Sequence, residues 1–175
     1  MSLDNKIARV RALLDAVQAE YVPVVFANSF GAEDMVLTDL IARYYPGIEM
    51  FTLDTGRLPE ETYKLMREVA ERYGIRIPIY FPESVAVEAY VAQNGPNGFY
   101  DSVDLRKTCC HIRKVEPLKR ALRGKRAWIT GLRRDQAPTR KDLTESEFDS
   151  DNGLQKISPL LDWRLSEVWT YLKQF

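Results

Sequence analysis

Two cysteines stand side by side in the stretch KTCCHIRK, residues 107–114, and the chain contains no others. Its only histidine, His111, follows them directly, and basic residues lie on either side. A tetrahedral zinc site needs four ligands, and three consecutive residues wrap one ion poorly. An iron–sulfur cluster takes four thiolates, of which Cys109 and Cys110 would supply half. The residues alone leave two interpretations open: half of a cluster site, or two cysteines adjacent by chance.

The segment NSFGAED, residues 28–34, follows an apolar run and leads into a helical pattern. Ser29 offers a hydroxyl, and Gly31 lets the backbone approach a ligand closely. The free N–H groups at the start of the following helix suit phosphate or sulfate. The segment matches neither of the common glycine-rich nucleotide loops. An ordinary strand-to-helix turn, with Asp34 in a capping role, explains the same residues.

Two further polar segments also follow apolar runs. In LDTGRLPEET, residues 53–62, Asp54 is placed to bind a ribose hydroxyl or an adenine amino group, although Asp, Thr and Gly are common in turns anyway. The stretch TGLRRDQAPTR, residues 130–140, carries three arginines, the residue type that binds oxyanions through two parallel hydrogen bonds. A solvated basic loop is the alternative. These arginines are Arg133, Arg134 and Arg140.

The elements that must position these segments alternate between strands and helices. Apolar runs predict strands within 21–29, 48–56, 75–82, 125–132 and 154–160. Helical spacing and stop signals predict helices over 4–20, 32–45, 59–74, 84–93 and 105–122, with a last helix from about Trp163. The polar segment 133–153 is expected to be a loop.

This alternation predicts one α/β domain over residues 1–175, with a doubly wound, mostly parallel sheet covered on both faces. Ligands bind such sheets outside the carboxyl ends of the strands. The turns after Asn28, Leu53 and Leu132 are therefore expected to converge on one crevice.

Composition restricts the class of protein. Lys plus Arg and Asp plus Glu both number 25, which argues against broad binding to nucleic acid or to an acidic membrane. No apolar run approaches the roughly 18 residues of a membrane span, and the charged N-terminus lacks the apolar core of a signal peptide. Two cysteines make no disulfide framework, which predicts a reducing cytoplasm. The final helical stretch has no stop signal, so we expect the protein to continue beyond Phe175.

Taken together, these segments resemble the phosphoadenylyl-sulfate and adenylyl-sulfate reductase family. SFGAED, LDTGRLPEETY, GFYDSVDLRKTCCHIRKVEPLKRAL, AWITGLRRDQAPTR and ISPLLDW follow the family's order and spacing over almost the whole chain. The resemblance implies a Rossmann-like fold of the adenine-nucleotide alpha-hydrolase type. The paired cysteines are typical of the branch that contains a cluster and mostly reduces adenylyl sulfate. The resemblance therefore implies a cytoplasmic reductase that makes sulfite and AMP with electrons from thioredoxin or glutaredoxin.

The resemblance also implies roles for particular residues. The pyrophosphate loop would contain Ser29, Phe30, Gly31 and Asp34. The second nucleotide-contacting turn would contain Asp54 and Thr55. Two of the four ligands of a [4Fe–4S] cluster would be Cys109 and Cys110, with Lys114 between cluster and substrate. The phosphosulfate end would be lined by Gly131, Arg133, Arg134 and Arg140.

Two departures from the family pattern matter. Ala137 stands where many relatives have Ser, which removes one hydrogen bond to the oxyanion. The family's second cysteine pair and its nucleophilic tail cysteine are absent from the 175 residues and are expected beyond Phe175. The resemblance thus implies that this chain holds no catalytic nucleophile and does not turn over alone.

Three alternatives stay open. The nearest is a reductase of the 3′-phosphorylated nucleotide, phosphoadenylyl sulfate. An ATP-cleaving ligase or thiolase of the pyrophosphate-loop kind requires an SGG-x-DS loop. The residues Phe30 and Glu33 argue against this alternative. A non-catalytic nucleotide-binding domain is the third. Association into a homo-oligomer is compatible with all of them.

Overall fold

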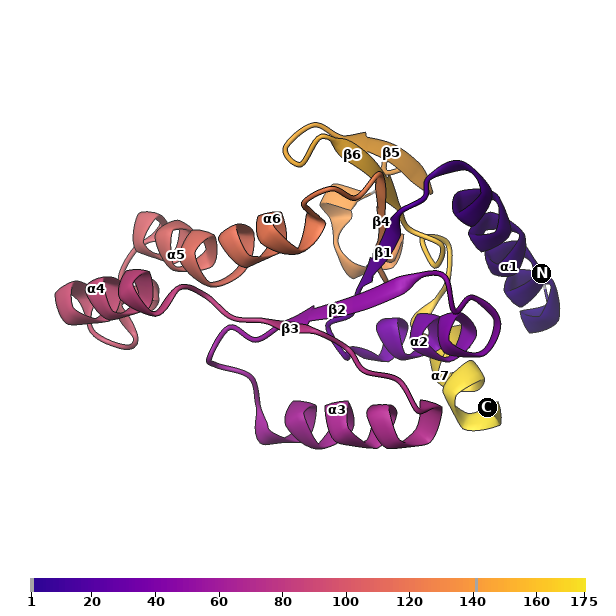
Figure 1. Ribbon diagram of the computed structural model, residues 1–175, viewed down its shortest axis with the longest axis horizontal. Helices are drawn as coiled ribbons and strands as arrows, with labels where there is room; N and C mark the ends of the chain where they lie inside the picture. Colours follow the sequence, from indigo (N-terminus) through magenta and orange to yellow (C-terminus); the bar gives the residue numbers. More distant parts are fainter. Residues whose placement is uncertain (1, 141) are drawn as a thin grey trace.

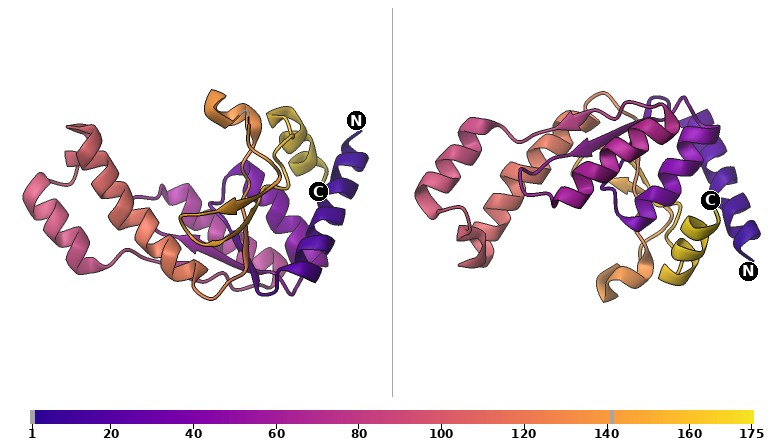
Figure 2. Two further views of the ribbon diagram at one scale, coloured as in Figure 1. Left: turned by 90° about the horizontal axis from the view of Figure 1, so that it is seen from above. Right: turned by 90° about the horizontal axis from the view of Figure 1, so that it is seen from below.

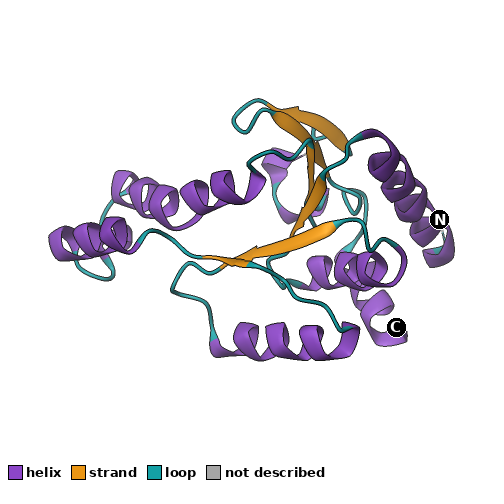
Figure 3. Cartoon of the chain, viewed as in Figure 1, coloured by secondary structure: helices purple, strands orange, loops and turns teal. Residues whose placement is uncertain are grey.

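The computed structural model describes residues 2–140 and 142–175 and contains a six-stranded sheet (Figures 1 and 3). Across the sheet the strands run in the order β3-β2-β1-β4-β6-β5. Every neighbouring pair is parallel except β5 with β6. The predicted mostly parallel sheet is therefore confirmed. The strands are β1 (Val24–Ala27), β2 (Glu49–Leu53), β3 (Ile79–Tyr80), β4 (Ala127–Ile129), β5 (Ser146–Asp149) and β6 (Leu154–Ile157).

Helices cover both faces of this sheet. Val24 and Phe26 of β1 belong to a buried cluster with residues of α1, α2 and α7, while Val25 packs with Ala121 and Leu122 of α6 on the other face. Successive residues of a strand point to opposite faces, so a strand that is apolar throughout requires cover on both. The helices are α1 (Leu3–Glu20), α2 (Ala32–Tyr44), α3 (Glu60–Tyr73), α4 (Ser84–Asn94), α5 (Val103–Cys110), α6 (Glu116–Leu122) and α7 (Leu165–Gln174).

The helices α4 and α5 form an arm that extends away from the sheet, at the end of the molecule opposite α1 (Figures 1 and 2). The Tyr90 hydroxyl of α4 donates to the Leu105 carbonyl of α5 at 3.1 Å, which ties the two helices together. A π-helical turn, His111–Val115, connects α5 to α6. The cysteine pair ends α5, so it lies where the arm joins the body of the domain.

Three sequence predictions differ from the structure. The predicted helix 105–122 is interrupted by the π-helical turn. Residues 75–82 form only the two-residue strand β3, because the prolines at 78 and 82 have no N–H to donate to a ladder. The segment 133–153 is not only a loop, because it contains β5 at the sheet edge, antiparallel to β6. Two 3₁₀ turns, Arg134–Gln136 and Pro138–Arg140, precede that strand.

A buried carboxylate fastens α7 to the domain. Asp39 of α2 accepts hydrogen bonds from the hydroxyls of Tyr171 in α7 and Tyr73 in α3, each at 2.7 Å, and from Arg43 Nε at 2.7 Å. Burial, followed by the hydrogen bond to Asp39, raises the pKa of Tyr73 to about 12. Burial, followed by the hydrogen bond to Asp39, also raises the pKa of Tyr171, so both hydroxyls stay protonated donors at neutral pH. One side chain of α2 thus holds two other helices.

Removing one of these donors is expected to destabilise the fold. Tyr171→Phe should lower the free energy of unfolding by about 1.5–3 kcal/mol, the usual range for a hydrogen bond to a charged group. Urea unfolding followed by circular dichroism measures this change. Tyr44→Phe, at an exposed tyrosine, is the matched control and should change stability by less than about 0.5 kcal/mol. Equal effects of the two substitutions would contradict the assigned role of Asp39.

Among the helices of residues 2–140 and 142–175, none has the length and apolar character needed to cross a bilayer.

Candidate functional site

The first strand-end turn, residues 28–31, is held in an unusual backbone shape. Phe30 has a positive φ of 60°, and its N–H donates to Asn28 Oδ1 at 2.8 Å. The Ser29 N–H and hydroxyl both donate to Asp34 Oδ2 at 2.6 Å. Gly31 is the N-cap of α2 and supplies no side-chain hydrogen bond to the first turn of this helix. The predicted pyrophosphate loop therefore has a defined conformation beside a helix N-terminus.

The first and third turns meet at Asp34. The backbone of Gly131, in the turn after β4, lies directly against the Asp34 carboxylate. A Cβ atom at Gly131 would lie 2.0 Å from Asp34 Oδ1, so only glycine fits there. Burial raises the pKa of Asp34 to about 6, although the hydrogen bonds from Ser29 and the nearby Gly131 N–H act in the opposite direction.

This close approach makes a prediction about Gly131. Gly131→Ala should lower the free energy of unfolding by about 1–3 kcal/mol, because either the turn or the buried carboxylate must move. Urea unfolding measures the loss. Gly47→Ala is the control, since the new methyl group would meet only the end of the flexible Gln18 side chain. If the two alanine variants unfold at the same urea concentration, the result would contradict the close approach of Gly131 to Asp34.

The second turn is built around Asp54, which is buried. Its carboxylate accepts the Gly56 N–H at 2.7 Å and the Tyr63 hydroxyl at 2.8 Å. The neighbouring Thr55 carbonyl accepts Arg113 Nη1 at 2.6 Å, which connects this turn to the π-helical turn after the cysteines. The first and second turns are adjacent as well, because the Asn28 N–H donates to the Phe51 carbonyl at 2.8 Å. The sheet thus brings all three turns to one edge.

The cysteine pair lines a cavity of about 250 Å³ that is shared with the second turn. Cys109 is buried and Cys110 is exposed. Thr55 and Phe99 contribute to the wall, and four cationic side chains complete it, namely Arg57, Arg106, Arg113 and Lys114. Two thiols within a cationic wall fit a thiolate-ligated cluster, whose net charge is negative. Within residues 2–140 and 142–175 no cluster of three or more His, Cys, Asp or Glu side chains is arranged to hold a metal ion.

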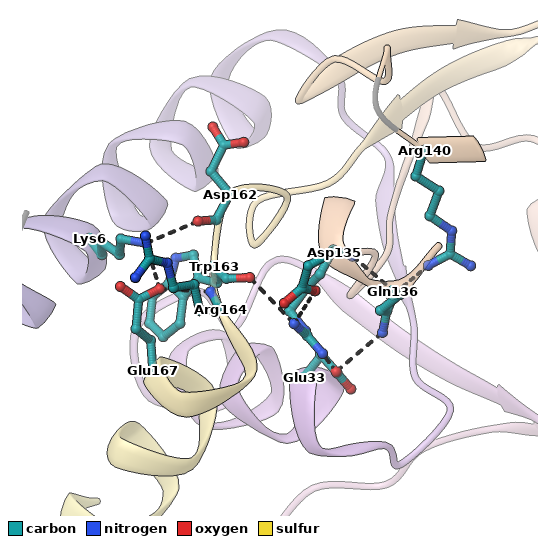
Figure 4. A network of polar contacts seen from close by, with 10 residues as sticks. Lys6, Glu33, Asp135, Gln136, Arg140, Asp162, Trp163, Arg164 and Glu167 are labelled. Carbon is teal, nitrogen blue, oxygen red and sulfur yellow. Dashed lines mark hydrogen bonds and ion pairs between the residues drawn. The ribbon is translucent and has the colours of Figure 1, made fainter. Parts of the chain in front are cut away.

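The three predicted arginines have different surroundings, and all bind protein groups. Arg133 is buried, its Nε donates to Glu33 Oε1 at 2.8 Å, and its Nη1 binds Asp135. Arg134 binds Asp162 Oδ1 at 3.1 Å and the Leu143 carbonyl at 2.7 Å. Arg140 binds Gln136 Oε1, and Gln136 Nε2 donates in turn to Glu33 Oε1 at 3.2 Å (Figure 4). Their predicted contact with phosphosulfate stays a prediction, and it is weakest for Arg133, whose charge two carboxylates already offset.

Sequence reasoning missed several residues that shape the site. Arg57 donates to the Pro96 carbonyl and to Asn97 Oδ1, each at 2.8 Å, and its guanidinium lies 4.8 Å from the centre of the Phe99 ring. These contacts tie the second turn to the loop of the arm. Glu33 was considered only as a departure from a ligase loop, whereas the structure makes it the partner of Arg133. The only sequence signal for Arg57 was its position next to the glycine of the LDTGR turn.

Residues 23–174 match the family model described as the phosphoadenosine phosphosulfate reductase domain. The chain belongs to this family. The resemblance seen in the sequence is confirmed for this reductase family, and the match covers the three turns and the cysteine pair.

Individual relatives agree with this membership. The chain is 51% identical to the adenosine 5′-phosphosulfate reductase of Allochromatium vinosum over 172 residues. This aligned region covers 98% of the chain and 67% of that relative. It is 49% identical over 173 residues to the enzyme of the same name from Burkholderia cepacia, covering 99% of the chain and 69% of that relative. The solved phosphoadenylyl-sulfate reductase of Candida auris, a phosphate complex, has a TM-score of 0.77 at 26% identity and covers 99% of this chain and 87% of its own. The predicted adenine-nucleotide alpha-hydrolase-like fold of this family member is thereby confirmed.

Proposed function

We propose that the chain binds adenylyl sulfate at its three strand-end turns and serves the reduction of this nucleotide to sulfite and AMP in sulfate assimilation. The observation that carries the proposal is the shared cavity, in which Thr55 of the second turn lies with the cysteine pair. A nucleotide bound along the turns would direct its phosphosulfate toward this cationic wall. The names of the two curated relatives, both adenosine 5′-phosphosulfate reductases, support this substrate.

Each part of the site has a role in this proposal. The N–H groups at the start of α2 receive the phosphate oxygens, and the Asp54 turn receives the nucleoside. Lys114 stands beside the sulfate group and offsets its charge, with Gly131 and the arginines of segment 130–140 at the same end. Because the phosphosulfate bond is already activated, the protein contributes orientation and charge stabilisation.

The proposed chemistry is an attack by a thiolate on sulfur. A sulfur–sulfur bond forms, the bond from sulfur to the phosphate oxygen breaks, and AMP leaves with the electron pair. A dithiol protein, thioredoxin or glutaredoxin, then reduces the resulting thiosulfonate, releasing sulfite and becoming a disulfide itself. In the proposal Cys109 and Cys110 are cluster ligands, so the attacking thiolate belongs to a different cysteine.

The same two thiols would hold part of a [4Fe–4S] cluster. The cluster takes four thiolates, and the 175 residues contain two cysteines, so two further ligands are required. When bound, it supplies a soft anionic centre at the end of α5. Arg57, Arg106, Arg113 and Lys114 would offset its charge. A single domain over residues 1–175 and a reducing cytoplasm, which keeps such thiols available, belong to the same proposal.

Calorimetric titration of the anaerobic chain tests the proposal. Adenylyl sulfate is expected to bind at least about ten-fold more tightly than phosphoadenylyl sulfate, because binding an extra phosphate requires a further cationic pocket. AMP should compete with it. Tighter binding of phosphoadenylyl sulfate would favour the alternative reductase activity. Mg²⁺-dependent release of pyrophosphate from ATP would favour a ligase or thiolase. Absence of binding for both sulfated nucleotides would contradict the proposed function.

A further inference from the structure

We infer that Asp34 is a positioning residue, which joins the first nucleotide turn to the turn after β4 and acts on the nucleotide only through the N–H and O–H groups that it holds. The inference rests on the proposed function and deepens it. It differs from the family expectation, in which Asp34 belongs with the residues that meet the nucleotide. The distinction matters because a positioning carboxylate and a contacting carboxylate respond differently to charge removal.

The geometry places one carboxylate between two turns. Asp34 Oδ2 accepts from both the N–H and the hydroxyl of Ser29 at 2.6 Å. The Gly131 backbone packs against the same carboxylate so closely that a Cβ atom there would lie 2.0 Å from Oδ1. The side chain is almost fully buried, with 6% of its residue surface exposed. The carboxylate of Asp34 therefore accepts its hydrogen bonds from other groups of the protein.

The electrostatics also argue against direct contact. An anionic phosphosulfate is repelled by a carboxylate at the same helix start, unless that carboxylate remains behind the loop. The charged groups near Asp34 are Glu33 on α2 and Arg133 on the turn after β4, and Arg133 binds Glu33. Ser29 supplies two neutral donors to the carboxylate, and the Gly131 backbone lies against it. The Thr38 hydroxyl donates to the backbone carbonyl of Asp34 at 2.7 Å. Asp34 therefore retains its own negative charge and organises neutral donors around it.

Ionisation of Asp34 works against folding stability. Its pKa is raised from 3.8 in the unfolded chain to about 6, mainly by burial. A group whose folded pKa is raised contributes stability below its unfolded pKa, and this contribution is lost as the pH rises through the folded value. At pH 8 the ionised side chain therefore destabilises the fold relative to a neutral residue of the same shape.

The first experiment tests the bridge without any nucleotide. In an NMR pH titration of the chain, the amide protons of Ser29 and Gly131 should shift with one common midpoint near pH 6. The Gly56 amide, which binds Asp54, is the internal control and should not share that midpoint. Asp34→Asn should abolish the shared transition. Separate midpoints for Ser29 and Gly131, or a shared transition that survives in Asp34→Asn, would overturn the inference.

The second experiment separates positioning from folding. At pH 8, Asp34→Asn should keep or raise the Tm, while its affinity for adenylyl sulfate falls at least about ten-fold. An amide offers one oxygen where the carboxylate offers two, one toward Ser29 and one against Gly131. Lowering the pH from 8 to 5.5 should weaken binding to the parent chain and leave the weak binding of Asp34→Asn almost unchanged. The inference would be overturned if Asp34→Asn bound adenylyl sulfate as tightly as the parent chain, or if its Tm and its affinity both fell. A parent chain that shows the shared titration but binds no adenylyl sulfate would contradict the proposed function and, with it, the role of the bridge in binding.

Discussion

The 175-residue chain, supplied with adenylyl sulfate and a dithiol reductant, is expected to bind the nucleotide and to release no sulfite above the uncatalysed background. The proposed attack on sulfur needs a thiolate that is not a ligand of the cluster. The chain has two cysteines, and the proposal assigns both to a cluster. The expected loss of rate is therefore nearly the whole enzymatic acceleration, about 10⁶-fold or more. Anaerobic sulfite detection, with thioredoxin and with dithiothreitol as reductants, measures it.

The contrary result would be specific. Sulfite release that disappears in Cys110→Ser and persists in Cys109→Ser would identify the exposed Cys110 as the nucleophile. That outcome would contradict the assignment of Cys110 to a cluster. Calorimetric binding of adenylyl sulfate to the same sample must accompany a negative result, so that an inactive chain is distinguished from an unfolded one.

Lys114→Met is expected to lower the affinity for adenylyl sulfate by about ten- to a hundred-fold. Lys114 lies in the wall of the cysteine cavity, and a charge-assisted hydrogen bond to an oxyanion contributes about 1.5–3 kcal/mol. Methionine keeps a similar length and removes the charge together with its N–H donors. Titration calorimetry at two salt concentrations measures the effect, which should shrink at high salt because the interaction is partly screened.

Lys119→Met on α6 is the matched control for this prediction. Lys119 is exposed and is not part of the cavity wall, so the same substitution should change the affinity by less than about two-fold. A comparable loss in both variants would indicate a general effect of net charge. No loss in Lys114→Met would contradict the placement of the sulfate group beside the cysteine pair.

Much of the fold was predictable because its signals are local. The helix α3 begins after a proline and ends at Gly74, whose φ of 64° is the left-handed conformation that stops helices. The continuous apolar runs predicted strands buried on both faces. By contrast, the edge strand β5 has the sequence Ser-Glu-Phe-Asp, in which exposed and half-buried residues alternate, so its polar character resembles that of a loop. The π-helical turn after the cysteines depends on hydrogen-bond register, which composition does not reveal.

The positions of the three turns were predictable, and their contacts were less so. The rule that ligands bind at the carboxyl ends of parallel strands located the three turns correctly at one sheet edge. The pairing of Arg133 with Glu33 joins residues a hundred positions apart, and no local pattern signals it. Asp34 was predicted to belong to the pyrophosphate loop, with a helix cap as the alternative, and its close approach to Gly131, almost a hundred positions away, has no local signal either. Contacts between residues distant in sequence decide whether a charged side chain faces the ligand or the protein. The sequence alone did not predict these contacts.

The central claim is that the nucleotide turns and the cysteine pair form one site, and the reactivity of Cys110 tests it most directly. Cys110 is exposed in a cavity that also includes Thr55, so its alkylation by iodoacetamide can be followed by mass spectrometry in the cluster-free chain. Saturating adenylyl sulfate is expected to slow this alkylation at least about five-fold, with a concentration dependence that matches the calorimetric Kd. An unchanged alkylation rate in chain that calorimetry shows to be saturated with nucleotide would contradict the account.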